Sequence, residues 1–466
     1  MSIEALSPPP ETSPLVPPAV RTAEGKALRT KIPREKLGGW KHDKHRKDPI
    51  AILRKSDPER MPALVPIRYG RMLQSPFAFY RGSVEVMAED LSHAPTTNLR
   101  VQACGDCHLA NFGGFATPER NVLFDINDFD ETLPAPWDWD VRRLVASFVL
   151  AARSRNFSDK QGRKAAVACA RSYREHMQEY SELDPLRLWY TRISSDDFLD
   201  SVPADRRKHA EKVIDKALAR GGSELAYPKL ADAVGGQIHI KDQPPLIFHS
   251  EGTLTHESLK LVEAIFHGYR ETLADDRRAL LDRYRLVDAA IKVVGIGSVG
   301  TWCSIVLLMS ERNSPLFLQV KQAHASVLEP FAGKSVYPHH GQRVVMGQRL
   351  MQPASDLFLG WTTGRGGRHL YVRQLRDAKI KPEIETFDVE VFDIYAGACG
   401  WALARAHAKT SEISPTISGY LGSSDEFDEA MGDFAVAYAD QAERDHAALK
   451  HAVHKGTIVV QEEADE

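Results

Sequence analysis

A glycine-rich turn followed by two β-branched segments is the feature that most constrains how this chain can fold. Gly295, Gly297 and Gly300 form the pattern G-x-G-x-x-G, and the residues that follow read TWCSIVLLMSERNSPLFLQVK. A dinucleotide-binding βαβ unit would continue with a helix after the third glycine. The apolar, β-branched runs on either side of the turn at 313–315 instead predict a β-hairpin. The pattern therefore favours an antiparallel sheet whose glycine-rich turn, with Ser298, covers the phosphates of a nucleotide.

Lys321 lies in the second strand of this predicted hairpin, within LFLQVKQA. A lysine in the strand after a glycine-rich turn is the residue type that pairs with nucleotide phosphates. The alternative is an ordinary exposed lysine, which the apolar run before it disfavours. Such a lysine usually has a glutamate partner on a nearby helix. The nearest predicted helix, 341–352, offers none and Glu329 follows the lysine closely, so the sequence leaves the partner open.

Two acidic loops in the first third of the chain carry oxygen ligands. The first, CGDCHLANF, contains Asp106 and, five residues later, Asn111; the second follows the predicted strand NVLFDIN and contains Asp128. Phosphoryl transfer needs a carboxylate that orients or deprotonates a hydroxyl, and oxygen ligands that hold Mg²⁺ against the phosphates. Asp125 also follows an apolar run and competes with Asp128 as the metal ligand, but the Asp-Phe-Asp triplet at 128–130 favours Asp128. One such loop would read as a simple turn, but two in this order favour a catalytic site.

The first loop also fits C-x-x-C-H, the attachment pattern of a c-type haem, through Cys104, Cys107 and His108. Covalent haem attachment requires export, and the N-terminal MSIEALSPPPETSPLVPPAV has no basic segment followed by an apolar one. A redox pair would need a thioredoxin-like βαβ context, which the sequence does not predict. We therefore expect His108 to brace the loop by hydrogen bonding.

The composition of the chain limits the kinds of partner that it can bind. The chain has 466 residues, is 43% hydrophobic and has a formal net charge of −3. These values are ordinary for a globular protein and provide no global field that attracts nucleic acid. The five cysteines are too few and odd in number for a disulfide scaffold, and no apolar run approaches the ~20 residues that span a bilayer. We expect a cytoplasmic protein that binds neither nucleic acid nor membrane.

Changes in residue pattern predict an α+β fold in four segments. A basic stretch at 34–55 shows no periodic face, which favours a solvated arm over a clamp on an anionic ligand. The predicted segments are a disordered Pro-rich tail (1–30), a mainly helical lobe with both acidic loops (31–286), a β-rich nucleotide-binding lobe (287–380) and C-terminal helices that complete the helical lobe (381–455).

The motifs SPFAFYRG, GDCHLANFG, DINDFDET, WDWDVRRL, VVGIGSVGT and LQVKQA resemble an uncharacterised bacterial family, the domain of unknown function 2252, over roughly residues 30–450. More distantly, the chain resembles the aminoglycoside and choline kinase-like phosphotransferases. In those enzymes the helix that resembles CGWALARAHAKT leads directly into the catalytic loop, whereas here it lies at 399–410, after the sheet. The resemblance therefore implies a two-lobed protein kinase-like fold that is circularly permuted.

The kinase-like resemblance also implies ATP, Mg²⁺ and transfer of phosphate to a hydroxyl. Asp106 then resembles the catalytic base, and Asp140 the aspartate that supports the catalytic loop from behind. Arg81 has no clear counterpart; it either reaches the active site or, more simply, is structural. The other implied roles are loop bracing by His108, metal binding by Asn111 and Asp128, and phosphate binding by Gly295, Gly297, Gly300 and Lys321.

Three hypotheses for function follow. The first is an ATP- and Mg²⁺-dependent phosphotransferase acting on a hydroxyl of a small molecule or a protein, with nucleotidyl transfer as a variant. The second is a kinase-like nucleotide-binding regulator without catalysis, which the missing glutamate favours. The third is an NAD-dependent oxidoreductase that uses the glycine-rich turn. The sequence does not identify the acceptor or the oligomeric state.

Overall fold

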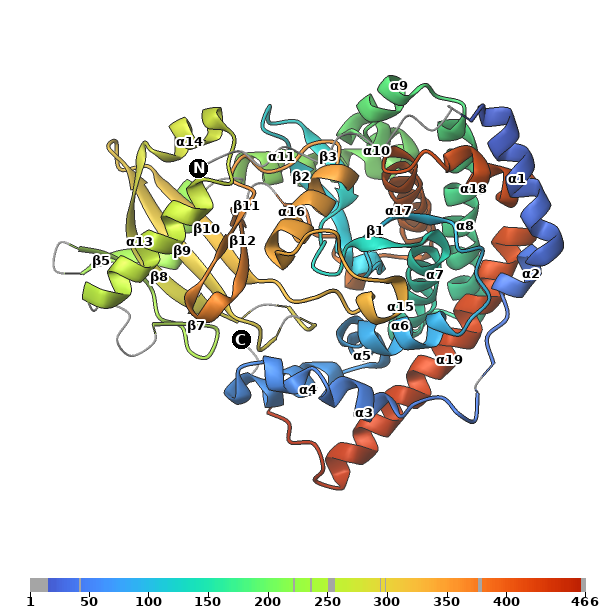
Figure 1. Ribbon diagram of the computed structural model, residues 1–466, viewed down its shortest axis with the longest axis horizontal. Helices are drawn as coiled ribbons and strands as arrows, with labels where there is room; N and C mark the ends of the chain where they lie inside the picture. The colour runs from blue at the N-terminus through green and yellow to red at the C-terminus, as the bar shows by residue number, and fades with distance from the viewer. Residues whose placement is uncertain are drawn as a thin grey trace.

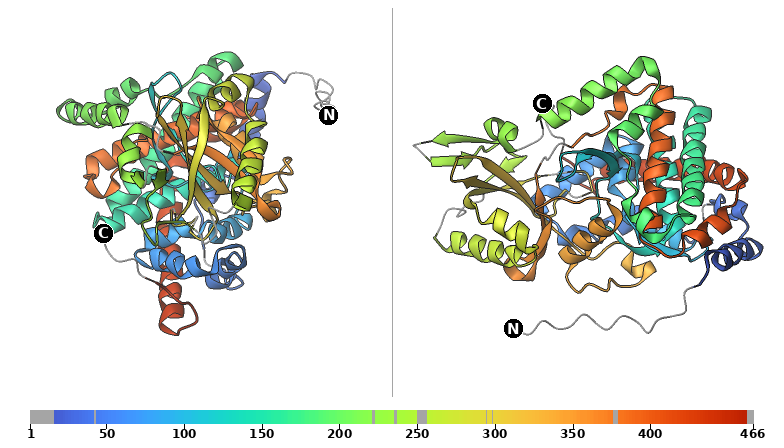
Figure 2. Two further views of the ribbon diagram at one scale, coloured as in Figure 1. Left: turned by 90° about the vertical axis from the view of Figure 1, so that its left-hand side faces the viewer. Right: turned by 90° about the horizontal axis from the view of Figure 1, so that it is seen from above.

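The computed structural model describes residues 16–461 except His42, 221–222, 235–236, 250–255, Val294, Ser298 and 376–378. An antiparallel sheet lies at one end of the molecule and a group of helices at the other (Figure 1). Helix α16 and two short two-stranded sheets lie between them, as the view from above also shows (Figure 2). The fold is therefore α+β, as predicted. No described helix is both long and apolar enough to cross a membrane.

The large sheet has six strands in the order β11-β12-β10-β9-β8-β7. The predicted hairpin is confirmed, because β9 and β10 pair antiparallel from Pro315 opposite Met309 to Lys321 opposite Cys303. Asn313 adopts a positive φ of 59° in the tight turn between them, a conformation that asparagine tolerates well. The strands are β7 (Ile247–Phe248), β8 (Tyr284–Lys292), β9 (Cys303–Ser310), β10 (Pro315–Gln322), β11 (Gly360–Thr363) and β12 (His369–Gln374).

Both faces of this sheet are covered, which explains why β9 is almost continuously apolar. On one face, Tyr269 and Leu281 from α13 (His256–Arg270) and α14 (Asp275–Leu281) pack with Val306 and Leu308. On the other face, residues of α12 (Ser223–Leu230) and of the hairpin β5 (Ala231–Val234) and β6 (Gln237–Ile240) pack with Ile305 and Phe317. These elements therefore pack with the sheet, although they precede the predicted boundary at 286–287.

The helical part is built on close helix pairs. Helices α8 and α17 make the most extensive of these contacts, and Gly400 allows it, since a Cβ there would collide with the carbonyl of Cys169. Helix α7 is buried along almost its whole length. The long helices are α7 (Trp137–Ser154), α8 (Asp159–Ser181), α17 (Val389–Lys409) and α19 (Glu426–His454), with α18 (Ser414–Leu421) beside them.

The N-terminal segment is more ordered than predicted. Residues of the expected disordered tail form α1 (Pro18–Lys31), which packs on α18 with Gly25 against the backbone of Thr416. Residues 1–15 lie outside the described residues. Arg46, in the basic stretch expected to be solvated, is instead buried between Asp90 and Asp445. Tertiary packing outweighs the Pro-rich and basic composition on which both expectations rested.

Two short two-stranded sheets carry the acidic loops. In the first, β1 (Arg100–Ala103) pairs with β4 (Leu133–Pro136), and in the second, β2 (Phe112–Ala116) pairs with β3 (Val122–Ile126). The remaining helices are α2 (Arg34–Leu37), α3 (Pro49–Arg54), α4 (Val65–Leu73), α5 (Pro76–Gly82), α6 (Val84–Ser92), α9 (Pro185–Tyr190), α10 (Ser195–Ser201), α11 (Ala204–Arg220), α15 (Glu329–Ala332) and α16 (His340–Met351).

Candidate active site

A pocket of about 560 Å³ lies between the glycine-rich turn and the two acidic loops. Segments far apart in the sequence meet here, since the loops precede α7 and the turn joins β8 to β9. Charged side chains of both signs line it, Arg60, Arg81 and Glu131 among them. The lining residues that the sequence predicted are Asp106, His108, Asn111, Asp128, Gly295 and Gly297.

The first acidic loop is held from behind by Asp140, in the first turn of α7. Its carboxylate accepts hydrogen bonds from the backbone N–H of Cys104 (2.8 Å) and of Gly105 (3.0 Å). Nε2 of His407, near the end of α17, lies 3.2 Å from the same carboxylate. Gly105 has a φ of 84°, and a Cβ there would meet the backbone of Glu131. The loop conformation therefore depends on α7, α17 and this glycine.

Asp106 pairs with Arg143 of α7. The Nε of Arg143 donates to Oδ1 of Asp106 over 2.7 Å, and its Nη2 donates to the carbonyl of Tyr80. Burial raises the pKa of Asp106 to about 6, although the Arg143 guanidinium acts in the opposite direction. The side chain keeps 22% of its surface exposed, toward a pocket that can take a ligand. A carboxylate with this pKa is ionised at neutral pH and can still accept a proton.

His108 lines the pocket beside Asp106, with its Nε2 3.9 Å from Oδ2 of the aspartate. Burial first, and then the charges of Arg81 and Arg143, lower its pKa well below the ordinary value, so the ring is neutral. The expected bracing hydrogen bond is not found, because Nδ1 has no partner among the described residues. Packing against Phe77, with the ring centroids 6.5 Å apart, positions the ring instead.

The second acidic loop lies against the first. The backbone N–H of Asn127 donates to the carbonyl of Asn111 over 2.8 Å, and the Asn111 amide donates to the carbonyl of Asp106 over 2.9 Å. Asp128 lies just beyond β3, and one of its oxygens accepts from the N–H of Asp130. Asn111 and Asp128 thus bring an amide and a carboxylate to one pocket. Mg²⁺ prefers such oxygen ligands, so this donor set fits the metal.

Asp125 lies outside the pocket, although the sequence suggests it as a competing metal ligand. Its side chain is 1% exposed and does not line the pocket. Its Oδ2 lies 2.5 Å from Nη2 of Arg405, a residue of α17 whose side chain is fully buried. Asp125 therefore fastens β3 to α17, and Asp128 is the aspartate that faces the pocket.

Lys321 has a carboxylate partner that the sequence did not indicate. Its Nζ lies 2.5 Å from Oδ2 of Asp130, and the hydroxyl of Tyr371 donates to Oδ1 of the same residue over 2.6 Å. Burial alone would raise the pKa of Asp130, but Lys321 and Tyr371 outweigh it and hold that pKa below its ordinary value. Neither Glu329 nor α16 supplies the partner; α16 instead contributes Arg343, which donates to the carbonyl of Asp130.

The glycine-rich turn is fastened to the segment before α4. Nη1 of Arg60 donates to the carbonyls of Gly297 (2.8 Å) and Val299 (2.6 Å), and the N–H of Met61 donates to the carbonyl of Gly300 (2.7 Å). Gly300 has a φ of 88° and does not line the pocket. Ser298 lies outside the described residues.

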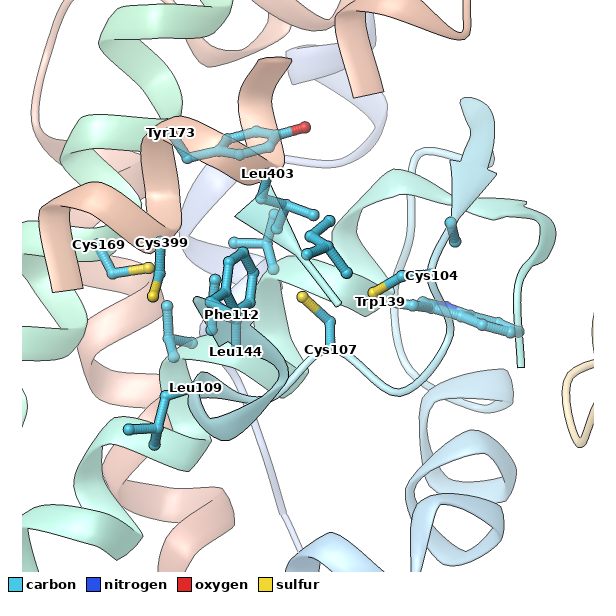
Figure 3. Close-up of a cluster of buried hydrophobic side chains, with 14 of the residues drawn as sticks. Cys104, Cys107, Leu109, Phe112, Trp139, Leu144, Cys169, Tyr173, Cys399 and Leu403 are labelled. Atoms are coloured by element: carbon cyan, nitrogen blue, oxygen red, sulfur yellow. The ribbon is translucent and has the colours of Figure 1, made fainter. Parts of the chain in front are cut away.

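The cysteines of the first loop face the core. Cys104 and Cys107 lie side by side among apolar side chains (Figure 3), with their sulfurs and an oxygen of Asp140 within 4.8 Å of one another. Burial raises the pKa of both thiols. Because the thiolate is the reactive and metal-binding form, this environment disfavours redox or metal chemistry at the pair.

Comparison with known proteins identifies the family. The sequence matches the family described as "Uncharacterized protein conserved in bacteria (DUF2252)" over residues 60–452. The chain belongs to this family. Neither the curated proteins nor the solved structures contain a match. The DUF2252 description assigns no activity, so the function has to be argued from the site.

Proposed function

We propose that this DUF2252 protein is a phosphotransferase with a circularly permuted, two-lobed protein kinase-like fold, which transfers phosphate from Mg²⁺-ATP to a hydroxyl group. One observation carries the proposal. Asp106, Asn111 and Asp128, which have the kinase-like spacing, line the same pocket as the glycine-rich turn. Those residue types and that turn are the parts that phosphoryl transfer requires.

The arrangement of the sheet supports the fold. The glycine-rich turn joins β8 and β9, and Lys321 lies on β10, the third strand counted from β8; the two-residue β7 precedes them at the edge of the sheet. Helix α16 follows, and the chain then returns to the sheet with β11 and β12. A kinase nucleotide lobe has the same order of turn, lysine-bearing third strand and helix.

The position of α17 supports the permutation. In kinase-like phosphotransferases the corresponding helix leads into the catalytic loop, but here the chain after α17 continues into α18. His407 near the end of α17 nevertheless contacts Asp140, which holds the first acidic loop. The helix and the loop are thus neighbours in space without being neighbours in sequence, as a permutation requires.

The residues then have defined tasks. Asp106 orients the acceptor hydroxyl and takes its proton, while the acceptor oxygen forms a bond to phosphorus and the bond to the ADP leaving group breaks. Asn111 and Asp128 would hold Mg²⁺, which neutralises charge on the phosphates. Lys321 supplies a further positive charge beside the second loop, and the turn at Gly295 and Gly297 excludes water.

A non-catalytic nucleotide-binding regulator is the second candidate. The observation that favours it is the partner of Lys321, which is Asp130 and not a helical glutamate. The position of β9 argues against an NAD-dependent oxidoreductase. This strand begins three residues after Gly300, where a dinucleotide-binding unit would have a helix.

The test is a titration of the purified full chain with ATP, ADP and NAD⁺, each with and without Mg²⁺, followed by thermal unfolding. Ligand binding to the folded state stabilises it by about 2.7 kcal/mol at a hundred times the dissociation constant. We expect a Mg²⁺-dependent rise in melting temperature with ATP, which Asp128→Asn abolishes. The matched control is Asp433→Asn, since Asp433 is 67% exposed on α19.

Two other results would change the proposal. Stabilisation by NAD⁺ alone would overturn it. Mg²⁺-dependent ATP binding without phosphate transfer to water, protein or a panel of hydroxyl compounds would select the regulator.

A further inference from the structure

Arg81 is a cation in the pocket without a hydrogen-bond or ion-pair partner in the part of the chain that the structure describes. It lies near the end of α5 and lines the pocket together with Asp106, Asn111 and Asp128. Its Nε is fully buried and has no hydrogen-bond partner, and the structure gives the guanidinium no hydrogen bond or ion pair to any described residue. The guanidinium lies over the ring of Phe77, whose centroid is 5.8 Å from Cζ of Arg81.

Other buried arginines near the site have at least one hydrogen-bond or ion-pair partner in the protein, even where a single nitrogen stays unbonded. Arg143 bonds to Asp106 and to the carbonyl of Tyr80, Arg405 pairs with Asp125, and Arg343 donates to three backbone carbonyls. Buried charged groups are normally paired in this way, because leaving them unpaired is costly. Arg81 departs from this pattern, and its position indicates that the missing partner is a ligand in the pocket.

The charges around Arg81 indicate what that ligand is. Burial lowers its pKa, whereas the carboxylates of Asp106, Glu385 and Asp128 favour its charged form. Its neighbour His108 is neutral and adds no positive charge. The Arg81 guanidinium thus acts on both the predicted base, which also pairs with Arg143, and the predicted metal ligand Asp128. The planar fork of an arginine matches the oxygens of a phosphate group.

We propose that Arg81 binds the phosphate group that is transferred, donating from its guanidinium to the phosphate oxygens that do not bridge. This inference rests on the proposed function and adds a residue for which the kinase-like resemblance has no counterpart. As the acceptor oxygen forms its bond to phosphorus and the bond to ADP breaks, the proton of the acceptor passes to Asp106. Arg81 then stabilises the charge that is spread over the outer oxygens.

The contact predicts a difference between nucleotides. ATP carries the transferable phosphate and ADP does not, so Arg81 should contribute to the binding of ATP alone. We would measure the affinities of Mg²⁺-ATP and Mg²⁺-ADP by isothermal titration calorimetry for the full-length wild type, Arg81→Met and Arg81→Lys. We expect Arg81→Met to lose at least roughly tenfold in affinity for ATP and to keep its affinity for ADP, with Arg81→Lys between them.

The control variant is Arg187→Met, because Arg187 is 77% exposed on α9 and distant in sequence from the site. Its two affinities should equal those of the wild type. A purely structural role for Arg81 would lower both affinities together or the melting temperature alone. If Arg81→Met does not fold, the ATP-to-ADP ratio of Arg81→Lys decides the question.

The experiment distinguishes a failure of the proposed function from a failure of the role proposed for Arg81. A wild type that binds neither nucleotide overturns the proposed function and this inference with it. A wild type that prefers ATP, with the same preference in both Arg81 variants, overturns only the role of Arg81. That result would assign the guanidinium to an anionic acceptor or to no ligand at all.

Discussion

At the scale of single residues, Asp106 shows how packing sets the chemistry of one carboxylate. Burial raises its pKa to about 6 against the opposing effect of Arg143. Asp106 is therefore protonated below that pH and unable to act as a base, and ionised above it. We predict that kcat/KM for phosphate transfer rises with a midpoint near pH 6 and is constant above about pH 7. Rates that do not change between about pH 5 and pH 7 would remove Asp106 as the base.

Asp125 and Asp128 are close in sequence, and the structure predicts opposite consequences of their substitution. Asp125→Asn leaves Arg405 buried without its ionic partner, and breaking such a pair costs about 3–5 kcal/mol. Urea denaturation should show this loss, while the protein that stays folded still binds Mg²⁺-ATP. Asp128→Asn should do the reverse, with stability near that of the wild type and binding lost.

A double variant provides the control for this prediction. Asp125→Asn combined with Arg405→Met removes both charges, so it should recover part of the lost stability. Asp125→Asn with unchanged stability and lost metal-dependent binding would contradict the assignment of Asp128.

The sequence located the acidic residues of the site because their spacing is local. Asp106 and Asn111 lie on one loop, and Asp128 follows the adjacent hairpin. It favours Asp128 over Asp125 but does not settle the choice, because that depends on which way the end of β3 faces. Nor could it find the partner of Lys321, since Asp130 lies 191 positions away.

At the scale of elements, the glycine-rich turn is held in place by the segment that precedes α4. Arg60 donates to two of its carbonyls and Met61 to a third. We predict that Arg60→Ala increases the rate of amide hydrogen exchange within 295–300 and weakens ATP binding, because the turn loses these hydrogen bonds. Hydrogen exchange followed by mass spectrometry measures the first effect.

Arg277→Ala is the control for the turn, because Arg277 lies on α14 with 38% of its side chain exposed. It should leave exchange in the turn unchanged. Equal exchange in Arg60→Ala and in the wild type would show that the backbone bond from Met61 and the packing of Val299 suffice.

The periodicity of the sequence predicts which helices and strands form. It is a poorer guide to which of these elements pack together. The hairpin of β9 and β10 was recognised from its β-branched runs, because a buried strand is apolar throughout. The sequence pattern places α12, α13 and α14 in the helical lobe, because a helical pattern looks the same whichever surface the helix covers. Only the contacts of Tyr269 and Leu281 with the strands show that they belong to the sheet.

At the scale of the whole molecule, the matched family region and the folded unit have different boundaries. The match begins at residue 60, yet α1, α2 and α3 lie before it and pack on α18 and α19. Arg46 in this segment separates two buried carboxylates, Asp90 and Asp445. Lys47, Ile52 and Lys55 also form part of the pocket wall. The N-terminal segment is thus part of both the core and the proposed site.

We therefore predict that a chain starting at residue 60 is strongly destabilised relative to the full chain. The truncation exposes the faces of α18 and α19, and it leaves Asp90 and Asp445 facing each other without Arg46 between them. The loss of that one arginine is expected to cost about 3–5 kcal/mol, so Arg46→Met should reproduce part of the effect in the full chain. Thermal unfolding and size-exclusion chromatography of the three proteins measure stability and aggregation. A chain from residue 60 that is monomeric and melts at the wild-type temperature would show instead that the family region folds without this segment, and that Lys47, Ile52 and Lys55 are an accessory wall of the pocket.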